Sequence, residues 1–276
     1  MKKEYINIIT YFYISIRHLL NAHILEARAY FVGGLWRTFE WISFPFKRNV
    51  VVCAFCGWEG PKYKTFVAST VLRHNALCPH CLSLERHREF LHLFKVISEH
   101  PNQLTSTILD IAPTLAFSNY CKNNEFIDYL SIDLQSQFAM KHMNLENLSL
   151  PSTTYDIVVC YHVLDYLNND AKGMSEIFRV LKDDGITITQ EGIDYQNSTS
   201  VEWEVALPEH EYRIRQYGFD FFDKWRSAGF EFLLIDREGV FSPVIISVKN
   251  SKLKALQALE NKLRENGYRV LTPLLN

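Results

Sequence analysis

The sequence predicts an α/β fold in which helices cover a mostly parallel, doubly wound sheet. Short apolar segments alternate with segments of helical periodicity between residues 107 and 190. This alternation is typical of βαβ units, whose parallel strands are buried on both faces. With 276 residues, 47% of them hydrophobic and 22% charged, the chain is long enough to bury such a core.

The expected strands end at residues that could bind a ligand. Strands are expected at 106–111, at 129–133, at 155–160 and from Gly185, with a helix at 170–181. Ligands of doubly wound sheets bind at the carboxyl ends of the strands. The residues at those ends are Asp110, Asp133, Tyr161 and His162.

The last third of the chain is expected to complete the sheet. Residues 221–236 read as a helix followed by a strand, and PVIISVKN at 243–250 is expected to close an antiparallel hairpin at the sheet edge. Residues 251–266 are expected to form a polar helix beyond the core.

Two Cys-x-x-Cys pairs indicate a metal site. Cys53 and Cys56 form the first pair, and Cys78 and Cys81 form the second, roughly twenty residues later. This spacing lets two tight turns present four thiolates to Zn²⁺, and because the set is complete the zinc should be structural. The six cysteines therefore suit a reducing cytoplasm better than a disulfide scaffold. The net charge of −2 gives no global reason to expect nucleic acid.

Residues 1–48 differ in composition from the rest of the chain. They are rich in aromatic and aliphatic residues, but arginines and lysines interrupt every apolar run before it could span a bilayer. The segment has no signal-peptide cleavage site. It reads either as two amphipathic helices packing on the main domain or as a basic, aromatic surface lying on a membrane.

A helix is expected to follow the second cysteine pair, with Ser83 as its cap and Ser98 near its end. Its charged face, ERHRE at 85–89, is either a solvated surface or part of the rim of a cofactor site.

The loop after the first strand has no glycine, since none occurs between Gly60 and Gly173. A dinucleotide needs glycines so that backbone amides can approach its phosphates. S-adenosylmethionine (SAM) has no phosphate, and a carboxylate such as Asp133 can bind its ribose hydroxyls. The alternative for Asp133 is a helix N-cap.

Several segments together resemble the class I SAM-dependent methyltransferases, over roughly residues 50 to 250. They are CPHCLSLERHR, ILDIAPTLAF, YLSIDLQSQ, VLDYLNNDAKGMSEIFRVL and EYRIRQYGFDFFDKWRSAGFEF. More narrowly, the chain is similar to a bacterial group in which a four-cysteine zinc element precedes the methyltransferase domain and Ala-Pro replaces the glycine loop. The resemblance implies a seven-stranded sheet and a SAM site made by Asp110, Ala112, Pro113, Asp133, Leu134, Asn144, Leu145 and Tyr161.

Two positions depart from the pattern of that group. Thr114 stands where an acid usually follows the Ala-Pro turn, and Asn144 stands where an Asp is common. Both residues keep hydrogen-bonding groups, so SAM binding is expected to be weakened and not lost.

Residues 191–218 are long for a simple connection and hold many aromatic and ionisable residues. The segment is either a solvent-facing excursion or the substrate side of the site. The substrate-side candidates are Trp203, His210, Tyr212, Arg213 and Tyr217.

The sequence therefore favours a SAM-dependent methyltransferase with a structural zinc site, in which His162 is the candidate general base. The alternative is a catalytically silent module whose zinc element docks a protein or RNA partner. The expected domains are a helical segment at 1–48, a zinc element at 49–83, a methyltransferase domain at 84–250 and a C-terminal helix at 251–276. We expect a cytoplasmic protein, with peripheral membrane contact through 1–48 as an option, and a small-molecule or glycan acceptor in preference to nucleic acid.

Overall fold

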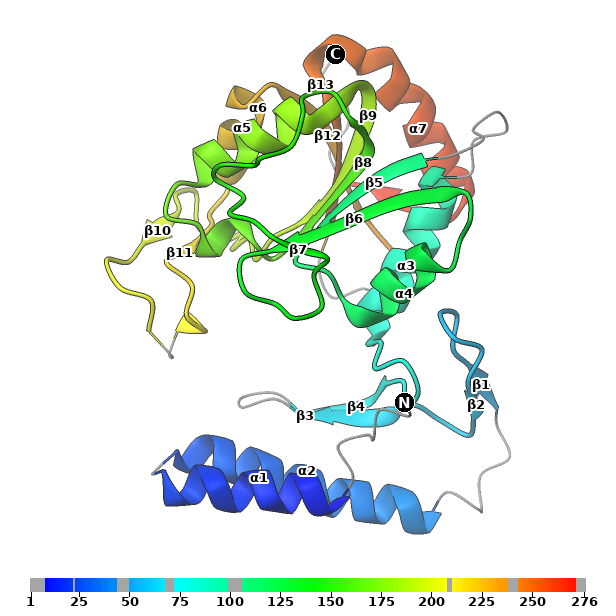
Figure 1. The fold of residues 1–276 in the computed structure, drawn as a ribbon, viewed down its shortest axis with the longest axis vertical. Coiled ribbons are helices and arrows are strands. Elements are labelled where there is room, and N and C mark those ends of the chain that lie inside the picture. The colour runs from blue at the N-terminus through cyan, green and yellow to red at the C-terminus, as the bar shows by residue number, and fades with distance from the viewer. Residues whose placement is uncertain are drawn as a thin grey trace. The chain divides into compact units, whose positions relative to one another are not determined.

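The computed structural model describes residues 8–21, 23–43, 50–67, 72–98, 106–207, 210–237 and 243–271. The chain divides into two compact units. The first comprises Met1–His92 with Leu115–Phe117, and the second comprises Leu93–Thr114 with Ser118–Asn276. The first unit holds two long helices and the cysteine pairs, and the second holds the large sheet (Figure 1).

The second unit is built on an eight-stranded sheet with the order β14-β12-β13-β9-β8-β5-β6-β7. Its strands are β5 (Ser106–Ile111), β6 (Ile127–Asp133), β7 (Lys141–His142), β8 (Tyr155–Tyr161), β9 (Leu181–Gln190), β12 (Phe230–Asp236), β13 (Val244–Lys249) and β14 (Arg269–Val270). Strands β7, β6, β5, β8 and β9 are parallel, and β13, β12 and β14 pair antiparallel. The predicted mostly parallel, doubly wound sheet is confirmed, with β14 as an additional short edge strand.

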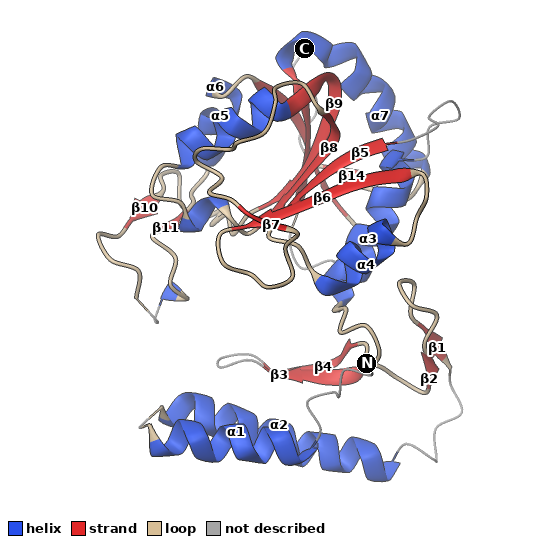
Figure 2. Ribbon diagram, viewed as in Figure 1, coloured by secondary structure: helices blue, strands red, loops and turns tan. Residues whose placement is uncertain are grey.

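Helices cover both faces of this sheet (Figures 1 and 2). The helices that follow the cysteine pairs are α3 (Glu85–Ser98), α4 (Leu115–Lys122), α5 (Asp170–Val180), α6 (Phe221–Ser227) and α7 (Leu253–Glu265), with short 3₁₀ turns η2 (Leu164–Tyr166) and η4 (Asn250–Lys252). The figures show α5 and α6 on one side of the sheet and α7 on the other. The core against α6 is aromatic: Trp225 stacks on Phe230 at 4.5 Å, and its indole N–H donates to Ser247 Oγ at 2.8 Å.

One expectation for the C-terminal third is confirmed and one is wrong. The antiparallel hairpin of β12 and β13 forms at this end of the sheet, where β13 pairs with β9 and the short β14 pairs outside β12. The final helix is not beyond the core, because α7 buries Leu256, Leu259 and Leu263 and contacts β12 and β13. Burying this apolar stripe stabilises the helix more than its polar composition predicts.

The first unit combines a helical hairpin with two small β-ribbons. The hairpin consists of α1 (Ile8–Leu20) and α2 (Ile24–Ser43), and the ribbons are β1 (Val51–Val52) with β2 (Glu59–Gly60) and β3 (Lys64–Val67) with β4 (Leu72–Leu77). Helix α2 packs on the second ribbon, where Gly33 leaves no room for a side chain because a Cβ would lie 2.5 Å from Val67 Cγ2. The expected pair of N-terminal helices is therefore present.

None of the described helices is long and apolar enough to cross a bilayer. Residues 1–7, 22 and 44–48 of the expected N-terminal segment lie outside the described residues.

Candidate functional site

The carboxyl edge of the parallel strands brings the predicted residues together. Ile111 of β5 lies between Ile132 of β6 and Cys160 of β8 in the register of the sheet, so the ends of these three strands are neighbours. Asp110, Asp133 and Tyr161 occupy those ends, and Glu191 follows β9 directly. The pairing extends one residue further, because His162 N donates to Gln190 O at 2.7 Å.

Two neighbouring strand ends have left-handed backbone. Ala112, just after β5, has a φ of 57°, and His162, just after β8, has a φ of 53°. For residues other than glycine this conformation costs roughly 1–2 kcal/mol, and such strain is common at functional sites. The Ala112-Pro113 turn therefore adopts a glycine-like bend without glycine, as the resemblance implied.

Asp110 is buried beneath the edge of the sheet. It is only 3% exposed, and its Oδ2 accepts a 2.6 Å hydrogen bond from the Tyr129 hydroxyl. Burial raises the pKa of Asp110 from 3.8 to about 7, although the hydrogen bond from Tyr129 acts in the opposite direction. The carboxyl group is therefore held in the interior of the protein, two residues before Ala112.

Asp133 combines the two roles considered for it. Its Oδ1 accepts hydrogen bonds from the backbone N–H groups of Gln135, at 2.8 Å, and Ser136, at 2.7 Å. Within the part of the chain that the structure describes, its Oδ2 has no hydrogen-bond partner. One oxygen thus shapes the turn, and the other is available to a ligand. The neighbouring Leu134 is exposed.

Of the two residues expected near adenine, Asn144 lies at the surface and Leu145 lies in the core. Asn144 is exposed, and its Oδ1 accepts a 2.9 Å hydrogen bond from Glu146 N. Leu145 is buried in the hydrophobic core with Leu164 and Met174, which favours a packing role. His162 is exposed, so it is not a buried core histidine.

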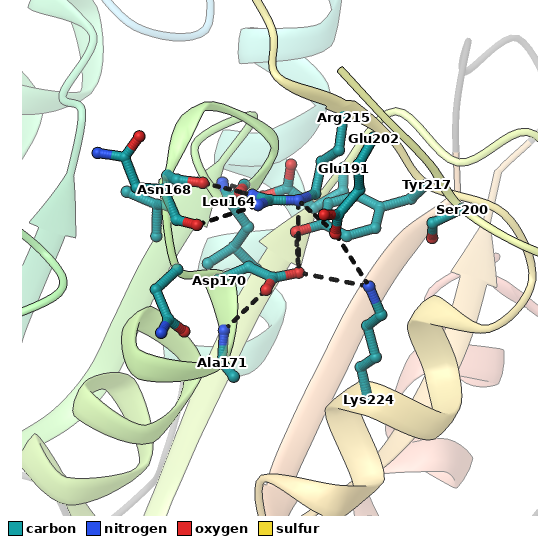
Figure 3. A network of polar contacts seen from close by, with 12 residues as sticks. Leu164, Asn168, Asp170, Ala171, Glu191, Ser200, Glu202, Arg215, Tyr217 and Lys224 are labelled. Atoms are coloured by element: carbon teal, nitrogen blue, oxygen red, sulfur yellow. Dashed lines mark hydrogen bonds and ion pairs between the residues drawn. The ribbon is translucent and has the colours of Figure 1, made fainter. Parts of the chain in front are cut away.

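A polar clamp holds the loop after β8 (Figure 3). Glu191 Oε1 accepts hydrogen bonds from the backbone N–H groups of Val163 and Leu164, both at 3.3 Å. Arg215 Nη1 donates to the carbonyls of Leu164, at 2.8 Å, and Leu167, at 2.6 Å. The two side chains therefore form hydrogen bonds with backbone N–H and C=O groups on both sides of the η2 turn.

The clamp extends to α5 and α6. Arg215 Nε lies 3.7 Å from Asp170 Oδ2 and 3.5 Å from Glu202 Oε1, and Lys224 pairs with the same two carboxylates (Figure 3). The Tyr217 hydroxyl donates to Asp170 Oδ2 at 3.0 Å. Glu191 and Arg215 belong to the segment expected on the substrate side, but neither was chosen as a candidate site residue, because a sequence does not show which charged residues become buried.

The carboxyl groups of Glu191 and Asp165, near the η2 turn, repel one another when both are charged. Burial raises the pKa of Glu191 well above its ordinary value, and the charge of Asp165 raises it further. Burial also raises the pKa of Asp165 to about 6, although Arg213, with Nη1 at 3.9 Å from Asp165 Oδ2, lowers it. Asp165 in the loop after β8 and Glu191, which contacts that loop, are therefore protonated more readily than exposed acids are.

The expected substrate-side residues lie on and around a short ribbon of β10 (Val201–Glu202) and β11 (Arg215–Gln216). The rings of Trp203 and His210 stack at 3.7 Å, and Tyr212 is 61% exposed. Tyr217, in contrast, is fully buried in the core. The ribbon is thus bound to the site loop through Arg213 and Arg215, while Tyr217 packs inside.

The four paired cysteines form a separate candidate metal centre in the first unit. Their four Sγ atoms lie within 4.8 Å of one another. Cys53 Sγ is 3.6 Å from Cys81 Sγ, and Cys56 Sγ is 3.7 Å from Cys78 Sγ. Ligands at about 2.3 Å from a tetrahedral Zn²⁺ would be roughly 3.8 Å apart. The cluster therefore has the dimensions of a tetrahedral four-thiolate site.

Two similar turns produce this cluster. Gly57 N donates to Cys53 O at 2.9 Å, and Leu82 N donates to Cys78 O at 3.1 Å. Gly57 and Leu82, each following the second cysteine of its pair, have φ values of 67° and 62°. Ser83 does not cap α3 as expected, since its hydroxyl lies 3.2 Å from Cys81 Sγ and 3.5 Å from Cys53 Sγ.

Comparison with known proteins identifies the class of fold. Residues 98–189 match the family described as "Methyltransferase domain". Together with the strand order and the mostly parallel sheet, this match gives the second unit the fold of a class I methyltransferase.

Solved methyltransferase structures are similar at low identity. A SAM-dependent methyltransferase from Thermotoga maritima is 15% identical, with 60% of this chain and 95% of that chain covered and a TM-score of 0.38. A SAM-dependent methyltransferase from Aquifex aeolicus is 15% identical, with 52% and 83% covered and a TM-score of 0.40. The 1,6-didemethyltoxoflavin-N1-methyltransferase of Burkholderia thailandensis, with bound S-adenosylhomocysteine, is 14% identical, with 52% and 71% covered and a TM-score of 0.40. No curated protein sequence matches the chain.

Proposed function

We propose that this protein is a SAM-dependent methyltransferase whose zinc site is structural. The observation that carries the proposal is the position of Asp133, at the carboxyl end of β6 with Oδ2 left to a ligand. A carboxylate at the end of the second parallel strand is well placed to accept hydrogen bonds from ribose hydroxyls. The match of residues 98–189 to a methyltransferase domain supports the same cofactor.

The residues of the edge fit SAM in three respects. Asp133 offers an acceptor for the ribose, the exposed Asn144 offers an amide near the expected adenine position, and the bend at Ala112 replaces a glycine turn. When bound, SAM supplies a methyl group on a positively charged sulfur. The chain's own residues then have to position the acceptor and exclude water.

His162 is the proposed base if the acceptor carries a proton. It is exposed beside the ends of β8 and β9, and its strained backbone is fixed by the hydrogen bond from its N–H to Gln190 O. Glu191 and Arg215 hold the following turn, so they act as positioning residues. Trp203, His210, Tyr212 and Arg213 are proposed to lie on the acceptor side.

Zn²⁺ is the metal that four cysteine thiolates at these distances favour. Because the four thiolates complete a tetrahedral set, the ion would stabilise the turns around Cys53 and Cys78 and leave no position for a reactant. A reducing compartment such as the cytoplasm is also proposed, because it would keep these four cysteines available to the metal as thiolates.

The acceptor is proposed to be a small molecule or a glycan. The decisive experiment incubates the protein and its Asp133→Asn variant with radiolabelled SAM and cell extract separated into small-molecule, glycan, lipid, RNA and protein fractions. Label that enters one fraction with the parent protein and not with the variant supports the proposal and names the acceptor class. If the protein binds SAM and labels no fraction, the silent-module alternative is favoured.

A further inference from the structure

The helical hairpin of the first unit exposes an extended apolar face. On α1 the face contains Ile9, Tyr13, Ile16 and Leu20, and on α2 it contains Ile24, Phe31, Leu35, Phe39 and Ile42. All nine side chains are between 49% and 81% exposed. Their spacing of mostly three or four residues places them on one side of each helix. Exposed apolar surfaces of this extent indicate interaction sites.

The faces of the two helices join into one surface. The rings of Phe12 and Phe31 meet edge to face at 5.6 Å across the hairpin, and Gly34 allows the Phe12 ring to approach α2 closely. Ser15 Oγ donates to Ala27 O at 2.6 Å, which further fixes the two helices side by side. The surface is therefore a rigid patch on a pair of helices.

Helix α2 is anchored to the β3–β4 ribbon through its other side. Glu40 is fully buried there and accepts hydrogen bonds from Thr65 N, at 3.0 Å, and from Lys62 Nζ, at 3.4 Å. The Trp36 ring lies 4.4 Å from the His74 ring. Within this unit, one face of α2 packs on α1 and a second face packs on the β3–β4 ribbon. The third face of α2, which is apolar, stays uncovered by either.

The charges around the face are basic. Arg28 stands between Ile24 and Phe31 on the exposed side of α2, and Arg17 is exposed on α1. Neither guanidinium pairs with a carboxylate among the described residues. The two acids of the described helices lie elsewhere: Glu40 is buried, and Glu26 is about 160° around the helix from Arg28.

The apolar face and the two arginines beside it distinguish between two binding partners, a second copy of the hairpin and an anionic bilayer. A second copy of the hairpin would bury Arg28 in an apolar contact with no acid on the matching face, which is costly. The surface of an anionic bilayer provides hydrocarbon for the apolar side chains and phosphates for both arginines. We infer that the apolar face of α1 and α2 docks this protein on an anionic membrane surface without crossing it.

Vesicle co-sedimentation of the full chain tests this inference. Vesicles of phosphatidylcholine alone are compared with an equimolar mixture of phosphatidylcholine and phosphatidylglycerol. The parent protein should sediment with the anionic vesicles only. Arg17→Gln and Arg28→Gln should each lower the partition coefficient about fivefold, since one arginine near the surface contributes about 1 kcal/mol. The double variant Ile16→Glu/Leu35→Glu should lower it at least tenfold.

The control variant is Phe126→Glu, which introduces one such charge at a 60% exposed apolar position of the second unit. It should bind vesicles as the parent does. Circular dichroism and metal content should show that every variant is folded. The inference is overturned if the parent ignores anionic vesicles, or if Ile16→Glu/Leu35→Glu binds them as well as the parent does. A parent dimer that the double variant converts to a monomer, without vesicle binding by either, would assign the face to a second copy.

Discussion

The Tyr129 hydroxyl donates a 2.6 Å hydrogen bond to the carboxyl group of Asp110. Asp110 is almost completely buried. Burial raises the pKa of Asp110 in the folded protein from 3.8 to about 7. The protonated form therefore favours folding. Between these two pH values the folded state binds a proton that the unfolded state has lost, so the free energy of unfolding falls as pH rises.

The Asp110→Asn variant should remove this part of the pH dependence, because its amide still accepts the Tyr129 hydrogen bond but does not titrate. Urea unfolding, measured at several pH values between about 4 and 7, should show that the free energy of unfolding falls less steeply with pH in the variant than in the parent. The difference in slope should be at most roughly 1.4 kcal/mol per pH unit. Equal slopes for parent and variant would show that folding does not raise the pKa of Asp110.

The cysteine cluster should contain about one zinc per chain. Cys78→Ser should lose the metal and destabilise the first unit, because three thiolates do not complete the tetrahedral set. Cys121→Ala is the matched control, since Cys121 is a buried cysteine of the second unit. The metal content of both variants is measured by elemental analysis and by the visible spectrum of the cobalt-substituted protein. Full metal occupancy in Cys78→Ser would contradict the assignment.

Arg215 should contribute strongly to stability. The Arg215→Met variant leaves the carbonyls of Leu164 and Leu167 without a donor, and Asp170 without its closest arginine. Removing one partner from a buried polar network typically costs about 3–5 kcal/mol. Arg264→Met should cost less than about 1 kcal/mol, because Arg264 forms an exposed pair with Glu260 within α7. Urea denaturation compares the two, and equal losses would argue against the clamp.

His162 should affect transfer more than cofactor binding. Asn tolerates left-handed backbone well, so His162→Asn keeps the turn and removes the imidazole. If His162 is a general base, the rate should fall by roughly 10²–10⁴-fold while SAM affinity stays within about twofold. Single-turnover kinetics with the labelled acceptor fraction measure the rate, and calorimetry measures the affinity. An unchanged rate would exclude His162 as the base.

The sequence predicts the features that depend on local pattern. The apolar runs at Ile108, Ile157 and Ile188 indicated β5, β8 and β9, and the paired cysteines indicated the four-sulfur cluster by spacing alone. The leucines of α7, at 256, 259 and 263, had helical spacing that would have predicted a buried stripe, but the polar composition concealed it.

Features that depend on distant contacts were not predictable. Glu191 and Leu164 are 27 residues apart, and Arg215 and Leu164 are 51 residues apart, yet these contacts position the loop after β8. Strand order also follows from packing of the whole chain, so the sequence did not show that β13 lies between β9 and β12. The strain at Ala112 and His162 is likewise a property of the assembled sheet, since either residue alone is compatible with ordinary backbone.

The most direct test of the central claim is calorimetric titration of SAM into the parent protein and into two single variants. Asp133→Asn keeps an Oδ1 acceptor for the N–H groups of Gln135 and Ser136, but it removes the charge proposed to bind the ribose. Loss of charge-assisted hydrogen bonds should weaken SAM binding by roughly one to two orders of magnitude. Asp128→Asn changes an exposed aspartate at the opposite end of the same strand and should bind SAM as the parent does. A parent protein that binds no SAM, or an Asp133→Asn variant with unchanged affinity, would contradict the account.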